Sequence, residues 1–160
     1  MTRKLLSTRC WAAFLLGGTT MAVLNILIVE DNAGDRRLLR LALLEQAYEC
    51  MVDEVDGAEA ALEMLAQNAA SVDVVLLDGR LNGANSTSVI DRIKGLAGTH
   101  IVVLTGSSSK AEHAEFISHG ADAVMEKTAE LDGLIENLSK LKRYAGLAKI
   151  RSNLRQQLQS

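Results

Sequence analysis

The chain has 160 residues, of which 48% are hydrophobic and only five are aromatic, so it can form one domain with an aliphatic core. Its net charge is −3 at pH 7, and its two cysteines argue against a disulfide-stabilised scaffold and favour a reducing compartment. All 20 acidic residues lie between residues 21 and 138, together with only eight basic ones, which argues against a nucleic-acid-binding body.

The first 20 residues contain three bases, no acid and a short apolar run, and this pattern superficially resembles a secretory signal. The apolar run at residues 11–16 is far too short to span a membrane. Regular patterning begins only after Met21. We therefore predict that residues 1–22 are an N-terminal extension that is disordered or lies upstream of the biological start. A weak export or membrane-touching segment is the alternative.

From Leu24 onward, short apolar runs alternate with longer amphipathic ones. The run "LNILIV" is too short for a helix and rich in β-branched residues, which is typical of a strand buried on both faces. In chain order the pattern predicts a strand at 24–29, a helix at 35–46, a strand at 49–55, a helix at 58–67, a strand at 72–78, a helix at 86–96, a strand at 100–105, a helix at 109–118, a strand at 121–127 and a helix at 131–144.

Five strands that alternate with five helices predict an α/β fold, in which a parallel sheet is covered on both faces through right-handed crossovers. The carboxyl ends of the strands then share one edge of the sheet, where the functional crevice of such folds lies. Three carboxylates, one hydroxyl and one ammonium follow or close four of these strands: Glu30, Asp31, Asp78, Thr105 and Lys127.

Each of these residues alone has an ordinary explanation, such as a helix cap or a surface lysine, but their shared position predicts a site. Three carboxylates repel one another, and a divalent cation relieves that repulsion. Oxygen ligands suit Mg²⁺, and a carboxylate beside Mg²⁺ can attack phosphorus to give an aspartyl phosphate. A lysine and a threonine hydroxyl are suitable partners for phosphoryl oxygens.

Four segments in this order and spacing, "ILIVEDN", "VVLLDGRLNG", "VVLTGSS" and "GADAVMEK", resemble the motifs of the response-regulator receiver domain of the CheY-like superfamily. The resemblance covers about residues 24–143 and implies a doubly wound, flavodoxin-like sheet of strand order 2-1-3-4-5 with five flanking helices. It divides the chain into the extension 1–22, a receiver domain at 23–144 and a basic amphipathic tail at 145–160. It also implies a single-domain response regulator.

By position, the resemblance implies that Asp78 accepts a phosphoryl group and that Mg²⁺ is the cofactor. The implied metal ligands are Glu30, largely through water, Asp31, Asp78 and the backbone carbonyl of Arg80. The implied phosphoryl ligands are Gly79, Thr105, Gly106 and Lys127.

The resemblance further implies a cytoplasmic switch in a two-component or phosphorelay system rather than an enzyme, one that at most catalyses its own phosphorylation and dephosphorylation. Its partners would be a histidine kinase or histidine-phosphotransfer protein and a downstream protein target, with no direct DNA binding and no membrane span. A homodimer through the fourth and fifth helix face or the tail is a further expectation. The tail itself is either a sixth amphipathic helix or a frayed end.

The chain departs from the usual receiver pattern at four positions. It has no proline: Asn82 stands where one usually follows the acceptor segment, and Thr128 where a cis proline usually follows the lysine. A non-proline cis bond costs about 3–4 kcal/mol, and the sequence leaves open whether the peptide before Thr128 is cis or trans. Val124 replaces the usual reporter aromatic, and Gly106 the usual alanine. We therefore expect signalling without an aromatic swing.

Three other functions compete with the phosphoacceptor. A phosphorylation-independent receiver-like adaptor is favoured by Val124 and the missing prolines, and opposed by the complete set of site residues. An aspartyl-phosphate phosphatase usually needs a second acid two residues after the nucleophile, where this chain has Arg80. A nucleotide-binding flavodoxin-like protein lacks support because no glycine-rich loop follows the first strand.

Overall fold

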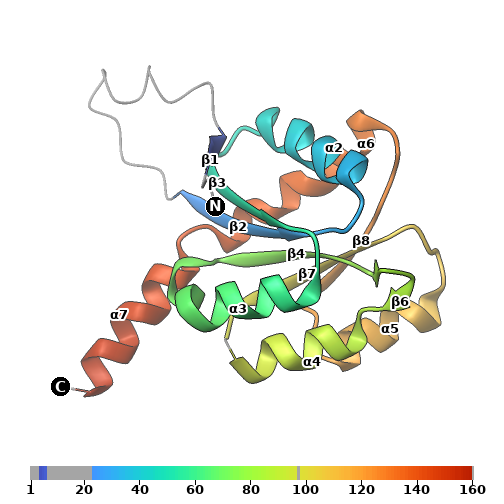
Figure 1. Ribbon diagram of the computed structural model, residues 1–160. Helices are drawn as coiled ribbons and strands as arrows, with labels where there is room; N and C mark the ends of the chain where they lie inside the picture. Colours follow the sequence, from blue (N-terminus) through green and yellow to red (C-terminus); the bar gives the residue numbers. More distant parts are fainter. Residues whose placement is uncertain (1–3, 7–22, 97, 160) are drawn as a thin grey trace, which may run out of the picture.

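The computed structural model describes residues 4–6, 23–96 and 98–159, and within them the predicted α/β architecture is present (Figure 1). The strands are β1 (Lys4–Leu6), β2 (Leu24–Val29), β3 (Cys50–Val55), β4 (Val74–Asp78), β5 (Arg80–Leu81), β6 (Ala84–Asn85), β7 (His100–Thr105) and β8 (Ala123–Glu126). The α-helices are α2 (Ala33–Leu44), α3 (Ala58–Asn68), α4 (Thr87–Leu96), α5 (Lys110–Ser118), α6 (Leu131–Ser139) and α7 (Leu147–Gln159). Short 3₁₀ helices, η1 (Ala69–Ser71) and η2 (Lys140–Tyr144), follow α3 and α6.

The five strands predicted from the apolar runs form a parallel sheet in the order β3-β2-β4-β7-β8, which confirms the predicted order 2-1-3-4-5. The first predicted strand, β2, lies between β3 and β4, and β8 forms one edge. This order reverses direction at β2, so the crevice at the carboxyl ends of β2 and β4 is the topological switch point of the sheet.

A strand that the sequence did not predict covers the other edge. Lys4–Leu6 forms β1 and pairs antiparallel with β3, so that Lys4 lies opposite Val52. This pairing occupies hydrogen-bonding groups that β3 would otherwise present at an open edge. The structure thus has a strand at Lys4–Leu6, within the segment 1–22 that was expected to be disordered or to lie upstream of the biological start. The remainder of the segment 1–22 lies outside the described residues, and there the expectation stays a prediction.

Alternating side chains of the strands pack into two apolar clusters, one on each face of the sheet. Ile26 and Ile28 belong to the cluster beneath α2 and α6, whereas Leu27 and Val29 belong to the cluster beneath α3, α4 and α5. Figure 1 shows the two helical layers on opposite sides of the sheet. Both clusters are aliphatic apart from a few aromatic residues, as the composition predicted. This two-sided burial fixes the register in which the strand ends meet.

The predicted tail forms the helix α7, so its helical alternative is the one observed. Leu147 packs against the cluster beneath α2 and α6, and α7 then leaves the domain beside η1 (Figure 1). Ile150, Leu154 and Leu158 are exposed along it. None of the described helices has the length and apolar character needed to cross a bilayer.

Two aspartates tie the strands together at the amino edge of the sheet, opposite the crevice. The buried Asp73 carboxylate accepts hydrogen bonds from the backbone N–H of Asn25 at 2.8 Å and from its side-chain amide at 3.1 Å. The Asp122 carboxylate accepts one from the backbone N–H of Ile101 at 2.8 Å and lies 3.3 Å from Lys94 Nζ. These contacts join β2 to the start of β4, and β7 to the start of β8.

We predict that Asp122→Asn destabilises the protein in a pH-dependent way. Burial raises the pKa of Asp122, but the hydrogen bonds from Ile101 and His100 and the charge of Lys94 outweigh it and lower the pKa below its usual value. A lowered folded-state pKa gives stability that is present above the unfolded pKa and is lost as the pH falls through the folded one. The variant should therefore lose about 1 kcal/mol of unfolding free energy near pH 7.

Urea unfolding of both proteins near pH 7 and near pH 3 measures this difference. The gap between wild type and Asp122→Asn should shrink at the lower pH. A gap that widens on acidification would contradict the assignment.

Candidate functional site

The side chains predicted at the strand ends converge in the structure on one crevice. Glu30 and Asp31 directly follow β2, Asp78 closes β4, Thr105 closes β7 and Lys127 directly follows β8. Backbone hydrogen bonds hold these ends together, since the N–H of Lys127 donates to the carbonyl of Thr105 at 2.8 Å. The convergence follows from the parallel direction of the strands.

Three carboxylates form an acidic cluster in this crevice. Glu30, Asp31 and Asp78 each offer one carboxylate oxygen, and these oxygens lie within 4.8 Å of one another. Oxygen donors at this spacing fit a hard divalent cation such as Mg²⁺. A cation there would also relieve the repulsion between the carboxylates.

Glu30 is the most deeply buried of the three, with 1% of its surface exposed. Its Oε1 accepts a hydrogen bond from the backbone N–H of Asn32 at 2.9 Å, and its Oε2 accepts one from Lys127 Nζ at 2.6 Å. Burial raises the pKa of Glu30 to about 7, although both hydrogen bonds oppose the rise. The Asp78 charge adds to the rise. A neighbouring cation would favour the ionised form of this carboxyl.

A hairpin after β4 fixes the other two carboxylates. The strands β5 and β6 pair across a turn in which Asn82 and Gly83 have φ of 51° and 80°. The N–H of Asn82 donates to Asp31 Oδ2 at 3.0 Å, and the N–H of Arg80 donates to Asp78 Oδ1 at 3.1 Å. Two left-handed residues are typical of an Asn-Gly hairpin turn, a signal that the prediction overlooked.

Lys127 supplies the positive charge of the site. Its Nζ lies 2.6 Å from Glu30 Oε2, 2.8 Å from Asp35 Oδ2 and 3.2 Å from Asp78 Oδ2. Burial alone would lower the pKa of Lys127, but the hydrogen bonds with Asp35 and Glu30 and the charges of Asp78 and Glu30 raise it above its usual value. Lys127 is therefore charged at neutral pH.

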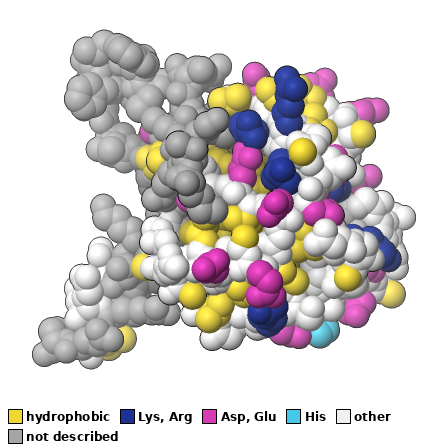
Figure 2. Space-filling view, viewed as in Figure 1, with side chains coloured by type: hydrophobic (Ala, Val, Ile, Leu, Met, Phe, Trp, Pro, Cys, Tyr) yellow, Lys and Arg dark blue, Asp and Glu magenta, His cyan; other side chains and the backbone are white. Residues whose placement is uncertain are grey.

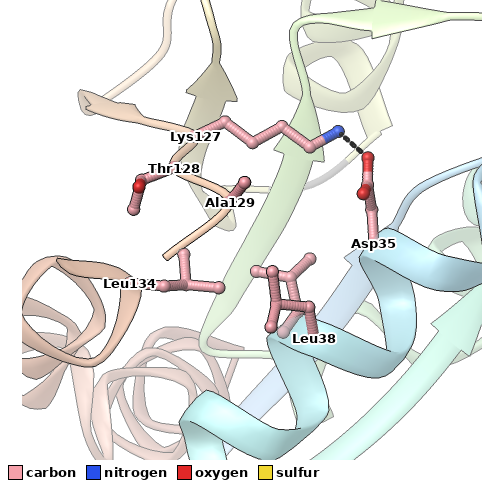
Figure 3. Close-up of a pocket in the computed structure, with 7 residues that line it drawn as sticks. Asp35, Leu38, Lys127, Thr128, Ala129 and Leu134 are labelled. Carbon is pink, nitrogen blue, oxygen red and sulfur yellow. Dashed lines mark ion pairs between the residues drawn. The ribbon is translucent and has the colours of Figure 1, made fainter. Parts of the chain in front are cut away.

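Asp35 was missing from the predicted site. The sequence pattern predicts Asp35 in the first turn of a helix, where an acid is favourable for the helix dipole alone. Its side chain also lines a pocket of about 270 Å³ beside the site, which lies between α2 and the start of α6 (Figure 3). Lys127 and Thr128 line the same pocket together with apolar side chains, among them Leu38 and Leu134. Only the tertiary contact with Lys127 reveals that Asp35 belongs to the site.

The ends of β4 and β7 approach closely at Gly79. A Cβ added there would lie 3.1 Å from Thr105 Cβ and 3.2 Å from Phe116 Cζ. The Gly79 N–H donates to the carbonyl of Leu104 at 2.8 Å, whereas the Arg80 N–H donates to Asp78 Oδ1. The Gly79 donor is thus used within the sheet in this structure, and its role as a phosphoryl ligand stays a prediction.

The loops after β7 (residues 106–109) and after β8 (residues 127–130) contain two of the departures from the usual receiver pattern, Gly106 and Thr128. Thr105 is buried, and its Oγ1 accepts a hydrogen bond from the N–H of Ser107 at 3.1 Å. Gly106 is exposed, with no atom within 4 Å of an added Cβ. Every peptide bond among the described residues is trans, including the one before Thr128. Val124 is half-buried and packs against the apolar cluster beneath α3, α4 and α5.

The model of the response regulator receiver domain matches residues 26–139. The chain belongs to the response regulator receiver family. This receiver is 31% identical over 121 residues to the two-component response regulator ORR41 of Oryza sativa subsp. japonica, covering 75% of this chain and 95% of that protein. It is 30% identical to the transcriptional regulatory protein ResD of Bacillus subtilis (strain 168) over 103 residues, and it spans only 41% of ResD.

Solved structures agree with this assignment. The receiver resembles the phosphorylated cyanobacterial phytochrome response regulator RcpA with a TM-score of 0.66 and 26% identity, covering 78% of this chain and 94% of that one. It also shares the fold of the Mn²⁺-bound form of response regulator Rcp1, at a TM-score of 0.61 and 23% identity, with 74% and 91% of the two chains covered. The family and the fold predicted from the four motifs are thus confirmed.

We predict that Gly79→Ala destabilises the receiver by about 1–3 kcal/mol, because the new methyl group would push against Thr105 and Phe116 in a packed region. Urea unfolding measures the loss. Gly57→Ala is the matched control, since an added Cβ there meets no atom within 4 Å. Equal effects of the two substitutions would show that the close approach at Gly79 is unimportant.

Proposed function

We propose that this receiver is a phosphoacceptor of a two-component or phosphorelay system. In this proposal Asp78 takes a phosphoryl group from a histidine kinase or a histidine-phosphotransfer protein. The observation that carries the proposal is the position of Asp78, which shares an acidic cluster with Glu30 and Asp31 while Lys127 Nζ lies 3.2 Å from its Oδ2. A nucleophile, a cation site and a fixed positive charge are the parts that phosphoryl transfer requires.

The transfer would proceed in one displacement. A carboxylate oxygen of Asp78 attacks the phosphorus of the donor's phosphohistidine and forms a P–O bond. The P–N bond breaks, and the imidazole nitrogen keeps its electron pair. When bound, Mg²⁺ would neutralise charge on the transferring group, held by Glu30, Asp31, Asp78 and the backbone carbonyl of Arg80.

The remaining groups of the chain would position the phosphoryl oxygens. The Lys127 ammonium is close enough to Asp78 to pair with a phosphoryl oxygen on it. Thr105 ends β7 beside the site, and its hydroxyl can donate to another oxygen, as can the exposed Gly106 amide. The Arg80 amide, already bonded to Asp78 Oδ1, would orient the acceptor carboxylate.

Signalling would then pass through protein contacts near the loop after β7 (residues 106–109). The Ser107 N–H donates a hydrogen bond to Thr105 Oγ1, so a phosphoryl group that binds this hydroxyl would change the loop before α5.

We assign the protein a cytoplasmic location and a downstream protein target. On the face in Figure 2, basic side chains stand among acidic and apolar ones, which does not favour direct DNA binding. A homodimer through the face of α5 and α6, the fourth and fifth predicted helices, or through α7 remains part of the proposal.

The phosphatase alternative fits this site poorly. Residue 80 would have to be an acid that protonates the leaving group, whereas the Arg80 guanidinium donates to the carbonyl of Gly83 at 3.3 Å. The receiver is therefore proposed as a switch and not as an enzyme acting on other substrates. The adaptor alternative predicts that no phosphorylation occurs, and the next experiment tests it.

We predict that acetyl phosphate with Mg²⁺ adds one phosphoryl group to the wild-type protein and none to Asp78→Asn, because Asp78 is the proposed acceptor within the acidic cluster. Intact mass spectrometry reads the modification directly. Asp132→Asn, which changes an exposed acid in the first turn of α6, should be phosphorylated like the wild type. An unmodified wild type would favour the adaptor, and modified Asp78→Asn would place the acceptor elsewhere.

We also predict that Asp31→Asn weakens Mg²⁺ binding by at least about tenfold, because the cluster loses one of its three charged oxygens. Amide chemical shifts of the hairpin residues, followed during a Mg²⁺ titration, give the affinity. Since Asn82 donates to Asp31 in the structure, its amide is a direct reporter. Unchanged affinity would remove Asp31 from the proposed ligands.

A further inference from the structure

The ammonium of Lys127 is shared among three carboxylates in this structure. A lysine ammonium carries three N–H donors, and Lys127 Nζ has three carboxylate partners at 2.6, 2.8 and 3.2 Å, on Glu30, Asp35 and Asp78. A phosphoryl group on Asp78 would need at least one of these donors. At least one of the three carboxylates must then lose or weaken its contact with Lys127 Nζ.

Asp35 differs from the other two partners in place and exposure. Glu30 and Asp78 belong to the acidic cluster, whereas Asp35 lies outside it on the first turn of α2. Its side chain is 43% exposed, against 2% for Glu30 and 11% for Asp78. Figure 3 shows the Lys127 side chain extending to the Asp35 carboxylate on α2, with which it forms an ion pair. Asp35 therefore contacts Lys127 from outside the cluster, and because its side chain is partly exposed, water can replace the lysine when the pair separates.

The position of Asp35 is fixed by the start of α2. The side chain of the N-cap residue Asn32 accepts a hydrogen bond from the N–H of Asp35 at 3.0 Å, and the N–H of Asn32 donates to Glu30 Oε1 at 2.9 Å. The helix start is thus tied to the acidic cluster itself. Asp35 is held in front of Lys127 by backbone geometry and not by a flexible loop.

We propose that Asp35 competes with the phosphoryl group for Lys127 and thereby limits how tightly the site holds that group. This inference rests on the proposed phosphoacceptor function. Asp35 is a positioning residue here, since it acts through the lysine and does not contact the reacting atoms. Through its charge, Asp35 sets the affinity of the site for the phosphoryl group or its mimic, and it takes no part in the chemistry of the transfer.

The sign of the effect follows from charge. Removing the Asp35 charge leaves Lys127 to Glu30 and Asp78 and makes the crevice more positive. A phosphoryl mimic, which is an anion, should then bind more tightly, whereas Mg²⁺ should bind more weakly to the mimic-free site. If Asp35 instead held Lys127 in its productive place, or if it only supported the start of α2, its loss would weaken binding of the mimic.

The test is a pair of titrations of Asp35→Asn and wild type, followed by amide chemical shifts of the Thr105–Ser107 loop. With Mg²⁺ saturating, beryllofluoride should bind Asp35→Asn about twofold to fivefold more tightly than wild type. Without beryllofluoride, Mg²⁺ should bind the variant about twofold more weakly. Both differences should shrink at high ionic strength, since Asp35 is partly exposed.

Two controls separate charge competition from a structural effect. Asp35→Glu keeps the charge and should stay within about twofold of the wild type in both titrations. Asp132→Asn makes the same substitution in the first turn of α6, where Asp132 has no ion pair among the described residues, and should change neither affinity. Thermal unfolding shows that each variant is folded under the titration conditions.

Tighter beryllofluoride binding together with weaker Mg²⁺ binding, seen in Asp35→Asn but in neither control variant, supports the competition. Weaker or unchanged beryllofluoride binding by folded Asp35→Asn overturns it while leaving the phosphoacceptor function intact. If the wild type itself fails to bind beryllofluoride with Mg²⁺, the proposed function fails, and this inference falls with it. The behaviour of the wild type thus distinguishes the two failures.

Discussion

The Lys127 ammonium offsets negative charge in the crevice of this receiver. Parallel strands bring Glu30 and Asp78 to the same edge of the sheet, and Asp35 reaches the same lysine from α2. Negative charges held this close raise the energy of the folded chain, and the cost grows with burial. Lys127 contacts all three of these carboxylates, and its own backbone N–H is bonded to the end of β7. Burial raises the pKa of Glu30 even though the hydrogen bonds from Lys127 and Asn32 lower it.

The two edges of the sheet serve opposite purposes. At the amino edge, Asp73 and Asp122 find backbone donors and join neighbouring strands. At the carboxyl edge, the carboxylates face one another and a single ammonium. The carboxylates at the amino edge use their charge to stabilise the fold. In the proposed function, those at the carboxyl edge bind a cation and a phosphoryl group, and the sheet between the two edges need not change.

The absence of proline is met by local geometry in two different ways. After Asp78, the Asn82-Gly83 turn closes a hairpin whose amides donate to Asp31 and Asp78. After the lysine, Thr128 follows a trans peptide, and its hydroxyl accepts a hydrogen bond from the N–H of Glu130. Both loops thus position site residues through hydrogen bonds, where a proline would act by limiting the backbone.

The sequence by itself determined the strands, their parallel sheet and the five side chains that follow or close them, because apolar runs are local features and parallel strands bring their carboxyl ends to one edge of a sheet. The strand order came from the resemblance to the receiver family. The Asn-Gly turn was also readable, although the prediction overlooked it. Tertiary structure alone decided three things. It assigned the Gly79 donor to Leu104, it paired Lys4–Leu6 with β3, and it brought Asp35 to Lys127. Each depends on a contact between distant segments, and neither composition nor periodicity carries the distance between two side chains on different elements.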